Sequence, residues 1–393
     1  MSPQLLIAGG GMGGLATALA CSRAGWPVSV YEQAARFTEV GAGIQLGPNA
    51  TRVLEGWGLA RALSAVAAFP QELRVRSARD GRQLATLRLG AAIAHRYGGP
   101  YATVHRADLQ AVLLEAVRAT GVEPTLAAKV TQVLPSAHGV AARIDGQGEV
   151  DGAALVGADG LWSSVRQQVW QDGLPRATGH LAYRGVIAQR ELPAALRSGD
   201  VNVWLGPRMH LVEYPVRGGS ELNVVVIVHG QSPGPAEDWD QEALAVELQR
   251  AMGKLCTPLR DLVRAIPSWR LWALNDRSPM RGPDEMARGR VALLGDAAHP
   301  MRPYFAQGAG MAIEDAAELA RLLAKNGRSE DVPVALRTYA LNRWRRGARV
   351  QALSRRNGRI FHATGLVRWG RDLALRLRGE RLLDQPWLYG SAR

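Results

Sequence analysis

A glycine-rich segment near the N-terminus carries the residues whose spacing first suggests chemistry. Residues 5–32 read LLIAGGGMGGLATALACSRAGWPVSVYE, in which an apolar run, a glycine cluster, a helix-favouring stretch and a second apolar run follow one another. A side chain at Gly9 or Gly11 would obstruct a tight turn or keep a pyrophosphate away from the backbone. Gly14 lets the helix lie close to the strand, and Glu32 can accept hydrogen bonds from a ribose. The pattern predicts a dinucleotide held at the N-terminus of a helix.

Two later segments place an aspartate directly after an apolar run. In ALVGADGLWSSVR the run leads to Asp159, and in VALLGDAAHPMRPYFAQGAGM it leads to Asp296. Such an aspartate can accept a hydrogen bond from a sugar hydroxyl, and backbone N–H groups at a helix start, here at Gly308, can hold a phosphate or a flavin carbonyl. Each segment alone is also consistent with an Asp-Gly turn or a helix cap. Their order along the chain indicates that all three segments serve one nucleotide.

The elements that position these residues follow from hydrophobic periodicity and from turn residues. A glycine-rich loop followed by a helix is expected over 41–63, and a hairpin over 71–88 with its turn at Asp80-Gly81. Strands are expected at 5–8, 28–31, 181–188, 201–205, 210–216, 222–228 and 290–295. Helices are expected at 12–23, 104–121, 241–252, 257–265, 308–326, 332–363 and 366–380.

This order predicts an α/β fold in which a Rossmann-like nucleotide-binding domain is interrupted by an antiparallel-sheet substrate domain and followed by C-terminal helices. The strand-like runs after residue 176 have no helices between them, which is typical of an antiparallel sheet. We expect the first part of the nucleotide domain at 1–175, the inserted domain at 176–284, the second part at 285–330 and a helical region at 331–393.

The net charge of +13 raises the question of a nucleic-acid partner. Fourteen arginines and four acidic residues lie in 331–393, so most of the excess charge belongs to the C-terminal region. That region has neither the spacing of a zinc finger nor an aromatic RNA-binding motif. We therefore expect no nucleic-acid partner, and interpret the region as a basic helical face that steers anionic small molecules or packs on the core.

Cysteine usage and hydropathy predict a cytoplasmic protein without a membrane span. The two cysteines, Cys21 and Cys256, are isolated, which is unlike a disulfide framework or a zinc site and fits a reducing compartment. No window offers about 18 uninterrupted apolar residues. We expect no secretion signal in residues 1–21, because no basic residue precedes Arg23 and glycines interrupt the apolar segment. We expect no metal site, and a monomer or a homodimer.

With HRADL (105–109), HLVEYPV (210–216) and the terminal QPWLYG (385–390), these motifs make nearly the whole chain resemble the single-component FAD-dependent aromatic hydroxylases. That family includes salicylate, hydroxybenzoate and 6-hydroxynicotinate hydroxylases. The resemblance implies that the predicted nucleotide domain binds FAD, with NADH or NADPH as a cosubstrate that has no Rossmann domain of its own. It assigns cofactor contacts to Gly9, Gly11, Gly14, Glu32, Arg106, Val130, Asp159, Asp296, Gly308 and Ala309. Among these, Val130 would meet the adenine through its backbone, and Asp296 would hold the ribityl chain.

The resemblance also implies a reaction. Two electrons from NAD(P)H pass through the flavin to O2, and the resulting flavin hydroperoxide attacks an electron-rich ring. The expected substrate is a small phenolic or hydroxylated heteroaromatic compound, carrying a carboxylate, whose ring a base activates by removing the phenolic proton. His210 and Tyr214 are the candidates, because residues four apart on a strand project to the same face. The alternatives are a hydrogen-bonded histidine under a sheet and a core tyrosine whose hydroxyl meets a carbonyl.

Three further residues, Arg184, Pro303 and Tyr304, are predicted to contact the substrate. Arg184 could pair with a carboxylate or be a salt-bridged strand residue. Arg302 could bind an acidic substrate or face solvent, and we expect it to face solvent. Relatives that act on 6-hydroxynicotinate place histidines where this chain has Gly47 and Tyr304, which disfavours that substrate.

Alternative functions on the same scaffold are a reductase, a halogenase, or a non-catalytic protein that binds a nucleotide and senses redox state. A halogenase is disfavoured because the three lysines of the chain, Lys129, Lys254 and Lys325, lie outside the motifs. The other two differ from a hydroxylase in that an aromatic compound would not trigger their oxidation of NAD(P)H with O2.

Overall fold

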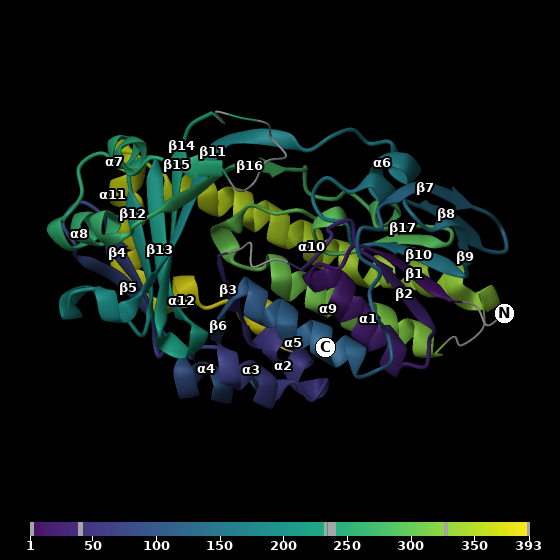
Figure 1. The fold of residues 1–393 in the computed structure, drawn as a ribbon. Coiled ribbons are helices and arrows are strands. Elements are labelled where there is room, and N and C mark those ends of the chain that lie inside the picture. The colour runs from purple at the N-terminus through teal and green to yellow at the C-terminus, as the bar shows by residue number, and fades with distance from the viewer. Residues whose placement is uncertain (1–3, 38–41, 232–233, 235–240, 326–328, 391–393) are drawn as a thin grey trace.

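The computed structural model describes residues 4–37, 42–231, 234, 241–325 and 329–390. A mainly parallel sheet lies at one end of the molecule and a larger, mainly antiparallel sheet at the other, and the 30-residue helix α10 (Val332–Phe361) runs between them (Figure 1). This arrangement confirms the predicted α/β fold with an inserted antiparallel sheet.

The parallel sheet has the strand order β17-β18-β10-β1-β2, and only β17 runs antiparallel to its neighbour. Its strands are β1 (Leu5–Ala8), β2 (Val28–Tyr31), β10 (Ala154–Gly157), β17 (Ala287–Arg288) and β18 (Val291–Leu293). Strands β1, β10 and β18 are buried along their whole length, as continuous apolar runs predict for parallel strands. Because the three strands are parallel, the predicted cofactor residues that follow them meet at one edge of the sheet.

Helices and two small sheets surround this core. The helices α1 (Met12–Arg23) and α9 (Gly308–Lys325) pack closely against each other, and α5 packs on α1. The remaining helices of this part are α2 (Pro48–Gly56), α3 (Ala60–Val66), α4 (Gly90–Tyr97), α5 (Arg106–Arg118) and α6 (Ser164–Trp170). The small sheets pair β3 (Gly43–Leu46) with β6 (Ala102–His105), and β7 (Val130–Pro135) with β8 (Val140–Ile144) and β9 (Gly148–Gly152). The loop expected at the start of 41–63 thus contains the strand β3.

The larger sheet has eight strands in the order β15-β16-β11-β14-β13-β12-β4-β5. Its strands are β4 (Glu72–Ser77), β5 (Gln83–Arg88), β11 (Arg176–Ala188), β12 (Val201–Gly206), β13 (Met209–Val216), β14 (Glu221–His229), β15 (Gln241–Ala243) and β16 (Trp269–Asp276). The predicted hairpin forms as β4–β5, and β4 pairs in parallel with β12, so the hairpin extends the inserted sheet. The domain boundaries themselves stay a prediction.

Two helices, α7 (Ala245–Met252) and α8 (Thr257–Ala265), cover the face of the inserted sheet that is turned away from the nucleotide domain. The helix expected at 241–252 begins late, because Gln241–Ala243 forms β15 on the edge of β16. The physical reason is that the edge strand β16 offers unpaired backbone groups, which a neighbouring extended segment satisfies.

The C-terminal helices are α10, α11 (Gly365–Arg378), α12 (Glu380–Leu383) and α13 (Pro386–Tyr389). Several of their arginines pair with acids of the core: Arg343 contacts both Glu314 and Asp315 on α9, and Arg346 contacts Glu314. In the described residues, the basic region therefore packs on the nucleotide domain, one of the two roles predicted for it. Within the part of the chain that the structure describes, no helix has an apolar stretch long enough to span a membrane.

Candidate active site

Two adjoining cavities lie between the parallel sheet, the inserted sheet and the C-terminal helices. One, of about 410 Å³, is lined by the glycine turn after β1, the start of α9 and the face of β13. The other, of about 660 Å³, extends from it toward α10 and α11 and is mostly apolar in its lining. We call them the nucleotide cavity and the inner cavity. The residues that line both, and so mark their junction, are Gln45, His210, Val212, Pro303 and Ala306.

The three glycines of the first motif differ in what prevents or permits a side chain at each position. Gly9 has a φ of +104°, and a Cβ there would lie 2.5 Å from the carbonyl oxygen of Ala158. A Cβ at Gly14 would lie 1.8 Å from the carbonyl oxygen of Gly9, so helix α1 approaches the turn too closely for any side chain. A Cβ at Gly11, by contrast, would meet no protein atom within 4 Å and would project into the nucleotide cavity, which Gly11 lines. The protein fold alone does not require glycine at that position.

The charged residues predicted to contact the cofactor gather around this turn. The Glu32 carboxylate accepts hydrogen bonds from the backbone N–H groups of Gly10 (2.6 Å) and Ala34 (2.8 Å). Arg106 and Asp296 line the nucleotide cavity. Burial lowers the pKa of the Arg106 guanidinium, while the nearby carboxylates of Asp296 and Glu32 raise it. Glu32, Arg106 and Asp296 thus form one electrostatic group, although they lie far apart in the sequence.

Asp296 is exposed to the cavity, whereas its other sides face protein. The surrounding protein raises the pKa of its carboxyl, and the charges of His299 and Arg106 oppose that rise. Gly308 and Ala309 line the same cavity at the first turn of the 18-residue helix α9. Free backbone N–H groups at such a helix start attract an anion or a carbonyl oxygen.

Asp159 is turned away from the cavity, although its neighbours Ala158 and Gly160 line it. One oxygen of its carboxylate accepts hydrogen bonds from the Ser164 hydroxyl and from the backbone N–H of Val165, both at 3.1 Å. The Ser164 hydroxyl also lies 3.0 Å from the carbonyl oxygen of Val130. Asp159 therefore holds the first turn of α6, whose N-cap is Ser163, and Ser164 links that turn to β7. Direct contacts of Asp159 and Val130 with the cofactor stay a prediction.

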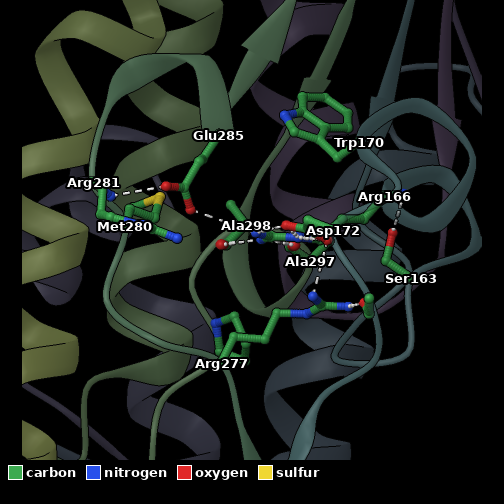
Figure 2. A network of polar contacts seen from close by, with 12 residues as sticks. Ser163, Arg166, Trp170, Asp172, Arg277, Met280, Arg281, Glu285, Ala297 and Ala298 are labelled. Atoms are coloured by element: carbon green, nitrogen blue, oxygen red, sulfur yellow. Dashed lines mark hydrogen bonds and ion pairs between the residues drawn. The ribbon is translucent and has the colours of Figure 1, made fainter.

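A buried arginine joins the second motif to the third. Arg166 is 3% exposed, donates hydrogen bonds to the carbonyl oxygens of Ala297 (3.0 Å) and Ala298 (2.6 Å) and pairs with Asp172. Figure 2 shows these contacts. Arg277 contacts the same carboxylate at 3.0 Å. Although burial raises it, the two guanidinium groups bring the pKa of Asp172 below its usual value. The network fixes the turn that directly follows Asp296.

His210 and Tyr214 lie on β13 and both line the nucleotide cavity, as their spacing predicts. His210 is 2% exposed, and its Nδ1 lies 2.8 Å from Nε2 of His362. Burial and the neighbouring His180 lower its pKa to about 3. The Tyr214 hydroxyl donates a hydrogen bond to the carbonyl oxygen of Gly43 at 2.6 Å, and burial raises its pKa. The tyrosine thus makes the carbonyl contact that was the alternative to a role in proton transfer.

The predicted substrate contacts differ in position. Pro303 and Tyr304 line the inner cavity, and the Tyr304 hydroxyl lies 2.8 Å from Nδ1 of His180. Arg184 is buried on β11, with its guanidinium 5.1 Å from the ring centre of Trp272, which lines the nucleotide cavity. A role for these residues in substrate binding stays a prediction.

The expectation that Arg302 faces solvent is wrong. Its side chain is 18% exposed and pairs with Asp276 at 2.6 Å, and Arg355 contacts the same carboxylate at 2.9 Å. The reason is that Asp276 is buried at the end of β16, where an ionised carboxylate requires a cation.

Sequence reasoning missed a histidine cluster and one wall of the inner cavity. His180, His229 and His362 gather beside His210, and helices α10 and α11 supply side chains such as Ile360 and Leu375 to the wall. Single histidines in separate segments carry no signal that they meet. The amphipathic composition of the C-terminal helices could have suggested a cavity wall, but not which cavity.

The residues present fit FAD. The space beside Gly11 admits a pyrophosphate at the backbone, Arg106 offers a cation, and the start of α9 offers N–H groups across the same cavity. A dinucleotide cavity that opens into a largely apolar second cavity is the arrangement expected of a flavin-dependent oxidoreductase.

Comparison with known proteins agrees with this class. A sequence profile described as "FAD binding domain" matches residues 3–354, and the chain belongs to this family of FAD-binding proteins. It is 40% identical over 390 residues to a 3-hydroxybenzoate 6-hydroxylase of Polaromonas naphthalenivorans (strain CJ2), covering 98% of this chain and 95% of that protein. It is 35% identical over 362 residues to a 6-hydroxynicotinate 3-monooxygenase of Bordetella bronchiseptica (strain ATCC BAA-588 / NCTC 13252 / RB50), covering 90% and 91%.

Among solved structures, Klebsiella pneumoniae HpxO complexed with FAD and uric acid is similar over 97% of this chain and 94% of that one, with a TM-score of 0.84 and 26% identity. The resemblance to FAD-dependent aromatic hydroxylases is therefore confirmed. The protein is an FAD-dependent monooxygenase of aromatic compounds, with O2 and the NAD(P)H reductant typical of these hydroxylases. The readings as a reductase, a halogenase or a non-catalytic redox sensor are not supported.

Proposed function

We propose that the enzyme hydroxylates a small phenolic acid and that His210 is the base that activates its ring. The observation that carries the proposal is the position of His210, a buried histidine that lines both cavities at their junction. Bound FAD, once reduced by NAD(P)H, would supply an activated oxygen atom from O2. The ring to be hydroxylated would lie at the junction, within reach of that oxygen and of the imidazole.

Burial keeps the imidazole of His210 uncharged and so available to accept a proton, but the lowered pKa also makes it a weak base that must pass the proton on. Burial disfavours the imidazolium, so at neutral pH the ring carries one N–H group and one free lone pair. Accepting the phenolic proton leaves negative charge on the substrate oxygen and raises the electron density of the ring. Tyr214 positions the wall instead, because its hydroxyl holds Gly43 at the start of β3, two residues before Gln45.

A carboxylate on the substrate would be met by an arginine. Arg356 and Arg371 line the inner cavity, and Arg371 donates hydrogen bonds to the carbonyl oxygens of Ile360 and Phe361. We take Arg356 as the first candidate because it lines the inner cavity, and Arg184, which lies against Trp272, as the second. We further propose that the enzyme acts in the cytoplasm, as a monomer or homodimer, without a nucleic-acid partner.

The substrate is to be found by measuring NAD(P)H oxidation and product formation with salicylate, hydroxybenzoates, hydroxynicotinates and simple phenols. The relative named for 3-hydroxybenzoate makes that compound the first to test. Oxidation of NAD(P)H that no compound of the panel stimulates would contradict the proposal of a small phenolic acid.

The role of His210 is tested by the fraction of NAD(P)H oxidation that yields product in His210→Ala and Tyr214→Phe. Loss of the base should lower this fraction in His210→Ala with FAD content intact, because oxygen activated without an activated ring is lost as peroxide. Tyr214→Phe should have a smaller effect, through the wall. His95→Ala, at an exposed histidine on α4, is the matched control. Unchanged coupling and unchanged substrate affinity in both cavity variants would mean that the base lies elsewhere.

A further inference from the structure

Four of the eight histidines of the chain gather at one place beside the inner cavity: His180, His210, His229 and His362. Three of them form a continuous chain of contacts. Nδ1 of His210 lies 2.8 Å from Nε2 of His362, and Nδ1 of His362 lies 3.0 Å from Nε2 of His229. Both ring nitrogens of the middle histidine are therefore engaged by another imidazole.

The two ends of the chain differ in exposure. His210 and His362 are buried, at 2% and 5%, and His210 faces the cavities. His229, at the end of β14, is exposed. The contacts thus lead from the proposed substrate position to solvent through a single buried ring.

The backbone holds the three rings in place. His210 is paired with Ile227 across β13 and β14, so His229, two residues further along β14, projects to the same face of the sheet. His362 directly follows α10, where its N–H donates to the carbonyl of Gly358 and its own carbonyl accepts from the N–H of Arg208. Fixed positions of this kind are needed if a proton is to move between rings without their separation.

We propose that His362 and His229 relay to solvent the proton that His210 takes from the substrate hydroxyl. The inference rests on the proposed function of His210 as the base. In this scheme His362 and His229 contact neither the substrate ring nor the flavin. They act through His210, by passing on the proton that it accepts.

The transfers conserve atoms and charge. The substrate O–H bond breaks as its proton joins Nε2 of His210, and the proton on Nδ1 of His210 passes to Nε2 of His362. The proton on Nδ1 of His362 passes to Nε2 of His229, whose Nδ1 proton leaves to water. Each neutral imidazole ends as its other tautomer, and the only net change is a proton in solvent and a negative charge on the substrate oxygen. When the product oxygen takes a proton back from Nε2 of His210, the same transfers run in reverse from water and restore the starting tautomers.

The surroundings explain why the proton would not stay on the chain. Burial, then the other three histidines and Arg371, lower the pKa of His362 well below its usual value. Although His229 is exposed, the protein on one side of its ring and the charge of Arg208 lower its pKa. His180, outside the chain, meets the Tyr304 hydroxyl, and its charged neighbours are Arg302 and Asp276. A proton taken up at His210 is therefore stabilised only where it reaches water.

The test measures proton release directly. FAD-loaded enzyme without NAD(P)H is mixed with 3-hydroxybenzoate, or whichever compound of the panel is hydroxylated, in weakly buffered solution with a pH-indicator dye. Substrate ionisation is followed by ultraviolet absorbance in the same experiment. His362→Gln and His229→Gln should slow release on the order of 100-fold, since glutamine can hydrogen-bond but cannot relay a proton. Substrate affinity and the rate of flavin reduction should not change.

Two controls separate the relay from general disturbance of the cluster. His95→Gln alters an exposed histidine elsewhere and should release the proton at the wild-type rate. His180→Gln changes the electrostatic surroundings of His210 and His362 but leaves the chain of contacts intact, so it should slow release far less than His362→Gln does. Imidazole added to His229→Gln should restore part of the rate by replacing the exposed end.

The outcomes also separate this inference from the proposed function. If His210→Ala abolishes release but the His362 and His229 variants release at the wild-type rate, the relay is wrong and the base stands. If His210→Ala releases normally, the base assignment fails, and the relay with it.

Ring nitrogens of His180, His229 and His362 lie within 4.8 Å of one another. One equivalent of zinc in the purified enzyme, lost in all three variants, would also overturn the relay.

Discussion

Replacement of Arg166 by methionine tests how far the folding of the second motif supports the cofactor site. The guanidinium is nearly fully buried, donates to two backbone carbonyls of the turn after Asp296 and pairs with Asp172 (Figure 2). Removing one partner of a buried ion pair typically costs about 3–5 kcal/mol. Two features lower the expected value: Asp172 keeps Arg277 at 3.0 Å, and its side chain is 32% exposed. We therefore expect a loss near 3 kcal/mol, the lower end of that range.

The same change should weaken FAD binding, because the two carbonyls belong to the turn that positions Asp296. If Asp296 binds the cofactor as predicted, displacing its carboxylate would remove a hydrogen bond to a charged group, roughly 1.5–3 kcal/mol, or about 10- to 150-fold in Kd. Stability is measured as the free energy of urea unfolding of the apo-protein, and affinity by titration of the apo-protein with FAD. Arg166→Lys should fall between, since a compact ammonium cannot span both carbonyls and the carboxylate.

The matched control is Arg118→Met on α5, where the arginine pairs with Glu115 and Glu123 on the surface. Exposed pairs contribute about 0–1 kcal/mol, so this variant should unfold and bind FAD almost as the wild type does. If Arg166→Met loses no more stability than Arg118→Met, the buried network has no energetic role. A large loss of stability with unchanged FAD affinity would refute the coupling to Asp296 alone.

Three further predictions concern the nucleotide domain. Gly11→Val should fold with an unchanged melting temperature of the apo-protein but contain no FAD, because its side chain enters only the cavity; stoichiometric FAD in this variant would refute the assignment. Asp296→Ala should weaken FAD binding by roughly 1.5–3 kcal/mol in a titration, and an unchanged Kd would leave the carboxylate as a helix cap. Burial raises the pKa of Asp315, but His299 and Arg343 more than offset this and lower it from 3.8 to about 2. The folded-state pKa is depressed, so about 2 kcal/mol of stability is present above pH 3.8 and is lost as the pH falls toward 2; urea unfolding of Asp315→Asn should lack this acid-dependent loss.

The parts of the fold that could be predicted are those set by local backbone constraints. Gly9 needs a positive φ, and Gly14 lies too close to a carbonyl oxygen for a Cβ, so the turn is determined by residues that are near one another in the sequence. The parallel strands were recognisable because strands buried on both faces read as continuous apolar runs. The parts that could not be predicted depend on distant partners. β4 finds β12 more than a hundred residues away, and β15 forms only because β16 leaves an open edge.

The C-terminal arginines are a second case in which the sequence shows the residues but not their partners. The C-terminal arginines are visible in the sequence as a basic region, but composition does not say what they contact. In the structure Arg343 and Arg346 hold Glu314 and Asp315, on the second turn of α9, whose first turn lines the nucleotide cavity. Buried acids near the start of a helix are favoured by its dipole, and the arginines neutralise them. The basic region thus contributes to placing the start of α9, which lines the nucleotide cavity.

The histidine cluster shows most clearly that contacts between distant residues could not be predicted from the sequence. Strand periodicity alone suggested that His210 faces a cavity, since alternate residues of β13 share a face. The route by which a proton could leave had no counterpart in the sequence, because His362 lies 152 residues away from His210 at the end of another element. A buried base can act repeatedly only if the proton it accepts has an exit, as burial penalises the imidazolium. The requirement for an exit is therefore predictable from chemistry, whereas its residues become visible only when β13, β14 and the end of α10 are brought together.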